Sequence, residues 1–192
     1  MMRTGRWGAR WLMLAAVAAM TGALNTSAVN TSAVNIMGVA VAAEPETLAT
    51  SAGAPVVLGA GPVTVKLAAP PGKALSARVA SVAPDRKVYL VAKGLGTDAP
   101  PETIYQLYLG LPHGTVPSPD GPYYVGALNF FNAVGRSAGS DPRFLSFDVT
   151  ALLKTLHAQN ALADNATVTI MPAGQPRAGA KPVVNAISLV AQ

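Results

Sequence analysis

The side chains that most often do chemistry are scarce in this chain. It has two histidines, His113 and His157, and no cysteine. Imidazole and thiolate groups are the usual ligands of zinc and copper, and a lone loop histidine such as His113 is seldom a ligand. The absence of cysteine also excludes disulfides and a lipid-modified cysteine. We therefore expect no metal site and no bound cofactor.

Nucleophilic catalysis has no better basis in the sequence. A serine hydrolase needs a nucleophile, a base and an orienting group held together. The one Gly-x-Ser-x-Gly match, Gly135-Arg136-Ser137-Ala138-Gly139, lies in a polar turn region and not at the strand-to-helix turn that a nucleophile elbow requires. Asp120 or Asp148 with either histidine would be an arbitrary triad. Gly59-Ala60-Gly61 is followed by proline and lacks the third glycine of a dinucleotide-binding loop. We predict no catalytic residues and a protein that is not an enzyme.

The best candidate for a working surface is the Gly/Pro-rich segment 110–122. It holds four of the chain's sixteen prolines and one histidine. So much proline excludes helix and central strand, and the segment is too long for a tight hairpin turn. We expect a loop that faces a partner, and its candidate contact residues are Pro112, His113, Val116, Pro117, Asp120 and Tyr123.

The N-terminus has the pattern of a secretory signal peptide. Three arginines precede an apolar run at 11–24, and small residues at 41–43 stand before Glu44. The apolar run is shorter than the ~20 residues of a membrane-spanning helix. We predict cleavage after residue 43, a secreted or periplasmic protein, and no stable membrane insertion afterwards.

The basic charge belongs largely to this segment. The chain has 14 basic and nine acidic residues, a formal charge of +5. Residues 1–43 contain three arginines and no acid, so the remaining chain has eleven bases against nine acids and a charge of +2. A nucleic-acid partner is therefore not expected.

Short apolar runs separated by Pro, Gly, Asn and Asp predict an all-β fold. We expect residues 44–54 to be a flexible N-terminus and residues 55–192 to form an antiparallel β-sandwich of about seven or eight strands with one short helix. The strand-like runs are 56–58, 63–67, 74–81, 87–93, 104–109, 123–131, 144–149, 166–172 and 186–190. Run 87–93 is apolar on both faces and is expected to be an inner strand.

The helix is expected at residues 150–159, across one end of the sandwich. Thr150 is the expected N-cap, and Leu152, Leu153 and Leu156 share one face by their spacing. His157 then lies near the C-terminal end, where a positive charge interacts favourably with the helix dipole.

Taken in order, these runs resemble the C-terminal β-sandwich domain of the polyphenol oxidase and tyrosinase group of type-3 copper proteins. The similar segments are Lys87–Leu95, Ile104–Leu109, Tyr124–Asn129, Phe147–Leu156, Val168–Pro172 and Ile187–Leu189. They cover most of the chain after residue 43. Gln106 departs from the pattern, because the family usually has aspartate there.

The resemblance implies a non-catalytic domain. A type-3 centre holds two copper ions with three imidazoles each, and this chain has two histidines in all. In the family, the C-terminal domain covers the mouth of the copper site. The resemblance therefore implies a free-standing domain that binds, shields or helps mature a separately encoded tyrosinase-like copper oxidase subunit, with the loop at 112–123 as the contact.

Two other functions remain open on the sequence. The domain could be an extracytoplasmic binding module for a small molecule or a glycan, with no oxidase partner, using the aromatic residues of the central strands. A secreted hydrolase is the least favoured. The oligomeric state is not predicted.

Overall fold

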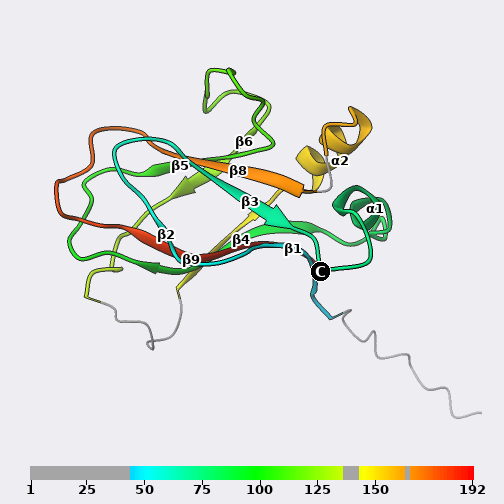
Figure 1. Cartoon of the computed structure of the whole chain (residues 1–192), viewed down its shortest axis with the longest axis horizontal. Coiled ribbons are helices and arrows are strands. Elements are labelled where there is room, and N and C mark those ends of the chain that lie inside the picture. Colours follow the sequence, from blue (N-terminus) through cyan, green and yellow to red (C-terminus); the bar gives the residue numbers. More distant parts are fainter. Residues whose placement is uncertain (1–43, 136–142, 163–164) are drawn as a thin grey trace, which may run out of the picture. The chain divides into compact units, whose positions relative to one another are not determined.

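The computed structural model describes residues 44–135, 143–162 and 165–192. The predicted signal peptide, residues 1–43, lies outside these residues and stays a prediction. Within them the chain forms nine strands and two helices (Figure 1). The strands are β1 (Glu46–Ser51), β2 (Val56–Val57), β3 (Val63–Ala68), β4 (Val88–Gly96), β5 (Tyr105–Leu109), β6 (Tyr124–Leu128), β7 (Phe144–Asp148), β8 (Asn165–Pro172) and β9 (Val183–Ala191), and the helices are α1 (Leu75–Ala80) and α2 (Thr150–Ala158).

The strands of the described domain form one sheet. Its order is β6-β5-β8-β3-β1-β9-β4-β7, with the short β2 paired to β9. Every pairing between named strands is antiparallel. The prediction of an all-β antiparallel fold is confirmed, and β4 is an inner strand between β9 and β7, as expected.

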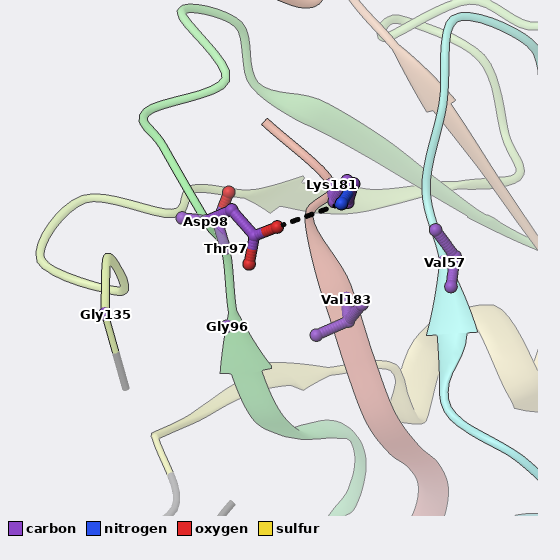
Figure 2. Close-up of a pocket in the computed structure, with 7 residues that line it drawn as sticks. All are labelled: Val57, Gly96, Thr97, Asp98, Gly135, Lys181 and Val183. Carbon is purple, nitrogen blue, oxygen red and sulfur yellow. Dashed lines mark ion pairs between the residues drawn. The ribbon is translucent and has the colours of Figure 1, made fainter. Parts of the chain in front are cut away.

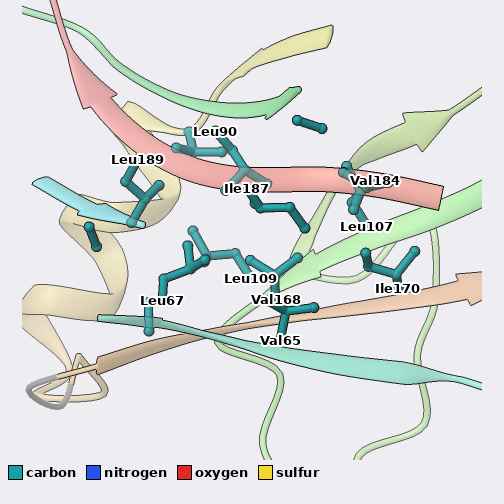
Figure 3. Close-up of a cluster of buried hydrophobic side chains, with 14 of the residues drawn as sticks. Val65, Leu67, Leu90, Leu107, Leu109, Val168, Ile170, Val184, Ile187 and Leu189 are labelled. Atoms are coloured by element: carbon teal, nitrogen blue, oxygen red, sulfur yellow. The ribbon is translucent and has the colours of Figure 1, made fainter. Parts of the chain in front are cut away.

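The core forms from residues that alternate along each strand. Leu107 in β5 lies opposite Ile170 in β8, and Leu90 in β4 lies opposite Leu189 in β9. All four side chains are fully buried (Figure 3). Because successive side chains of a strand point to opposite faces, burial of one set sends the other set to the outer face of the sheet.

The prediction that residues 44–54 are flexible is wrong. Residues 46–51 form β1, which pairs with both β3 and β9, and Leu48 and Ala49 are fully buried. The folded domain therefore starts before residue 55. Arg86 adds to this attachment, because its Nη2 donates to the carbonyl oxygens of Glu44 (2.8 Å) and Ala191 (2.7 Å).

The predicted strand at 74–81 is also wrong, since this segment contains helix α1. Leu75 and Val79 lie four residues apart, on one helix face, and both pack on the core. Alanine, leucine and arginine favour helix. Leu75, Ala77 and Val79 also fit the period of a strand, which is why the pattern alone misassigned the segment.

Helix α2 occurs where it was expected, and Leu153 and Leu156 are buried on its inner face. Thr150, however, is the first helical residue rather than the N-cap, which is Val149. The Thr150 hydroxyl and amide both donate to Asp148 Oδ1, at 2.7 and 3.0 Å. Helices α1 and α2 lie side by side at one end of the domain (Figure 1). Neither is long and apolar enough to cross a membrane, and the described residues contain no other helix.

The two outermost strands of the sheet, β6 and β7, approach each other and nearly close it. Gly126 in β6 lies under the ring of Phe147 in β7, and a Cβ added to Gly126 would be 2.6 Å from two ring carbons. The backbone of Gly126 also has a φ of 155°, which L-residues rarely adopt. The approach of the two strands therefore depends on the missing side chain.

Replacing Gly126 with alanine should destabilise the protein by about 1–3 kcal/mol, the usual cost of forcing extra atoms into a packed site. Denaturant unfolding would measure it. Gly59→Ala is the matched control, because a Cβ there meets nothing within 4 Å. Equal unfolding midpoints for the two variants would contradict the close approach of β6 and β7.

Asp148 links the end of β7 to the start of α2 and should make stability depend on pH. The hydrogen bonds from Thr150, together with the Lys87 ammonium 3.1 Å away, hold the pKa of the Asp148 carboxyl below its ordinary value. A lowered pKa in the folded state stabilises the protein above about pH 4, and this contribution is lost as the pH falls through the folded pKa.

Asp148→Asn should therefore cost at most about 1 kcal/mol at pH 7, since the carboxylate is partly exposed, and less at pH 3. Urea unfolding at both pH values would measure the difference, with Asp120→Asn as the control. A cost for Asp148→Asn that is the same at both pH values would disprove the assigned role of the charge.

Candidate functional site

The loop between β5 and β6 is held at its base and within its turns. The amide of Leu109 donates to the carbonyl of Tyr123 at 2.9 Å, and the amide of Gly110 donates to Thr167 at 2.8 Å. Within the loop, the amide of Thr115 donates to Pro112 and the amide of Gly121 donates to Ser118. Together with four prolines, whose φ angles are restricted, these bonds limit the number of conformations available to the loop.

The six predicted contact residues differ in exposure. Val116 is the most accessible, with 86% of its surface exposed, and Pro112, His113 and Asp120 are also exposed. Pro117 and Tyr123 are half-buried, and Tyr123 packs against the core. The structure thus presents Val116 at the surface, while Tyr123 anchors the end of the loop.

A groove of about 500 Å³ lies between this loop and the outer face of β3 and β8. The loop contributes His113 and its neighbouring prolines, and the sheet contributes Thr64, Thr167 and Thr169. The hydroxyls of Thr64 and Thr169 are 3.5 Å apart. Sequence reasoning found the loop but missed the threonines, because only strand pairing places residue 64 beside residue 169.

The aromatic residues of the central strands are mostly core, as their alternation predicts. Tyr105, Tyr108 and Phe130 are each at most 3% exposed. The Tyr105 ring meets the edge of Phe130 at a centroid distance of 5.7 Å, and burial raises the pKa of its phenol. These three rings therefore do not line a surface groove. Tyr123 and Tyr124 are half-buried and Phe131 is exposed (76%), so an aromatic binding surface would depend on these residues alone.

No metal-binding cluster of three or more His, Asp or Glu side chains occurs in the part of the chain that the structure describes. His113 lies in the loop, and His157 lies in the last turn of α2, as expected. Asp148 is bonded to Thr150 and Lys87. Its geometry is that of a structural carboxylate at the start of a helix.

A second hollow, which the sequence did not indicate, lies at the far end of β4 (Figure 2). Asp98 and Lys181 form an exposed ion pair across it, with 3.5 Å between Oδ2 and Nζ. Thr97 is 6% exposed, and its hydroxyl lies 2.6 Å from the carbonyl oxygen of Ala99 and 2.7 Å from that of Ala180. At this hollow the Thr97 hydroxyl therefore links the segment that follows β4 to the segment that precedes β9.

Thr97→Val keeps the shape of the side chain but leaves these carbonyls without their donor, which should cost about 1–3 kcal/mol. Thr64→Val, at an exposed position of β3, is the matched control and should change stability little. Thermal and denaturant unfolding would test both. A neutral Thr97→Val would disprove the structural role of this hydroxyl.

Comparison with solved structures finds latent polyphenol oxidases and tyrosinases, the group that the order of the motifs suggested. A recombinant latent aurone synthase (polyphenol oxidase) is 19% identical with a TM-score of 0.47, and the match covers 73% of this chain and 26% of that chain. A latent apple tyrosinase is 18% identical with a TM-score of 0.48, covering 72% and 27%. The match thus spans about a quarter of each enzyme's length.

No curated protein matches the sequence. A family model, described as a domain of unknown function and designated DUF7868, matches residues 41–192. These residues include all the strands and helices described above. The chain therefore belongs to the DUF7868 family.

Proposed function

We propose that this domain is an exported, non-catalytic binding protein that shields or helps mature a separately encoded tyrosinase-like copper oxidase. The order of the sequence motifs supports the choice of partner. The observation that carries the proposal is the position of Val116, an apolar side chain with 86% of its surface exposed on a restrained loop.

The restraint of the loop favours binding. A loop that is already ordered loses little conformational entropy when it docks, so more of the contact energy appears as affinity. Burial of a valine side chain contributes about 1.5–3 kcal/mol. In this proposal Val116 enters an apolar recess of the oxidase, and the neighbouring prolines hold it in position.

The export of the protein is part of the proposal and rests on the predicted signal peptide. The domain then meets its partner outside the cytoplasm. The small charge of the chain after residue 43, +2 by the count above, fits a contact made by apolar and neutral side chains.

The groove beside the loop supports a second function, a binding module for a small hydroxylated molecule or glycan. Threonine hydroxyls can donate and accept hydrogen bonds, and His113 adds a ring at the rim of the groove. In this function Thr64 and Thr169 contact the ligand and Val116 does not.

The test is binding of the purified protein to a tyrosinase-like subunit encoded in the same genome. Val116→Asp should weaken binding by about tenfold or more, because burial of the valine is lost. Val57→Asp is the control, since Val57 is also exposed (61%) but lies in β2. Replacement of residues 111–122 by a short Asn-Gly turn should abolish binding and any change in oxidase activity.

Unchanged binding and oxidase activity after the loop replacement would overturn the proposal. Glycan binding that Thr64→Val and Thr169→Val abolish, and that Val116→Asp leaves intact, would support the second function instead. Circular dichroism and unfolding midpoints would establish that each variant is folded.

A further inference from the structure

A second groove, of about 410 Å³, lies on the outer face of the sheet over β9, β4 and β7. Val91 of β4 and Val190 of β9 are apolar residues of its lining, together with Pro45 and Phe144. Phe144 has 63% of its surface exposed, although it is a large aromatic residue in a strand. The groove is on a different part of the sheet from the loop and shares no residue with the site proposed above.

The groove has three polar lining residues, Lys93, Ser146 and Gln192, and strand register places the first two. Lys93 lies directly opposite Phe144 across the β4–β7 pair, and Ser146 lies opposite Val91. An amine and a hydroxyl therefore stand next to the exposed ring and the apolar surface. Small-molecule sites commonly combine an apolar lining with a few convergent polar groups in this way.

The charges on this face favour an anion. Lys87 is paired with Asp148 on the same face, and Asp148 is also bonded to Thr150. Glu46 lies opposite the buried Ala191 of β9, does not line the groove, and is paired with Arg78 and Arg86. Among the described residues, Lys93 forms no ion pair. The cation beside the apolar surface thus has no carboxylate partner within the described domain.

We propose that this groove binds a small amphipathic carboxylate. The aryl or alkyl part packs on Val91, Val190 and the ring of Phe144, and the carboxylate pairs with the Lys93 ammonium and accepts a hydrogen bond from Ser146. The Lys93 ammonium, which has no ion-pair partner among the described residues, favours a carboxylate ligand over a neutral apolar one. The groove shares no residue with the loop site, so a failure of this proposal would leave the proposed contact with the oxidase unaffected.

The probe is 2-naphthoate, titrated into the purified protein by calorimetry, with its neutral amide as the comparison. Naphthoate should bind, and the amide should bind about threefold to fivefold more weakly, because an exposed ion pair contributes about that much. Backbone amide shifts in NMR spectra should locate the naphthoate at Val91, Ser146 and Val190.

Two pairs of variants distinguish the contribution of the Lys93 charge to naphthoate binding from that of the apolar contact with Phe144. Lys93→Gln should reduce naphthoate affinity to that of the amide, whereas Lys66→Gln, at another exposed lysine, should not. Phe144→Ala should weaken both probes about tenfold, through loss of apolar contact. Phe131→Ala is its control, because Phe131 is more exposed (76%) and does not line the groove.

Equal affinity of naphthoate and the amide, or no effect of Lys93→Gln, would overturn the assignment of a carboxylate. The groove would not be the binding site if Phe144→Ala left the affinity for naphthoate unchanged. The same conclusion would follow if naphthoate shifted the backbone amide signals of residues outside the groove. Dimerisation that Phe144→Ala abolishes, in the absence of naphthoate binding, would show that the face contacts a second copy and would also overturn the proposal.

Discussion

Strand β1 holds the two halves of the sheet together. On one side it pairs with β9 through residues 46–50, with a register shift between Thr47 and Ala49, and on the other it pairs with β3 through Thr50 and Ser51. Without β1, the order would separate into β6-β5-β8-β3 and β9-β4-β7, the two sheets of a simple sandwich. The inner faces of both halves meet in one core, so β1 fixes the position of each half relative to the other.

The surfaces proposed to bind partners depend on this arrangement. Each lies on the outer face of strands whose inner residues form the core, and alternation along the strand places the two sets back to back. The groove beside the loop lies over β3 and β8, and the groove with Lys93 lies over β9, β4 and β7. Because β1 joins these halves, the two grooves belong to one sheet and still contain different residues.

Much of the fold could be predicted from local pattern. The run 63–67 alternates clearly between apolar and polar residues and forms β3, and the nearly continuous apolar run 104–109 forms β5. Strand β1 was missed because Leu48 is its single large apolar residue, which is too little to produce a period. Helix α1 was missed for a different reason. Its short apolar pattern fits the period of a strand as well as that of a helix. Its packing against the core and beside α2 distinguishes the two.

The sequence by itself determined the all-β class, the place of the proline-rich loop and the shortage of histidine and cysteine for metal chemistry. These properties depend on composition and on neighbours along the chain. The tertiary structure decided that β1 joins the two halves, that Thr64 stands beside Thr169, and that Lys93 stands beside Phe144. Strand register brings together residues that are far apart in sequence, and the alternation of a single strand carries no information about its neighbour.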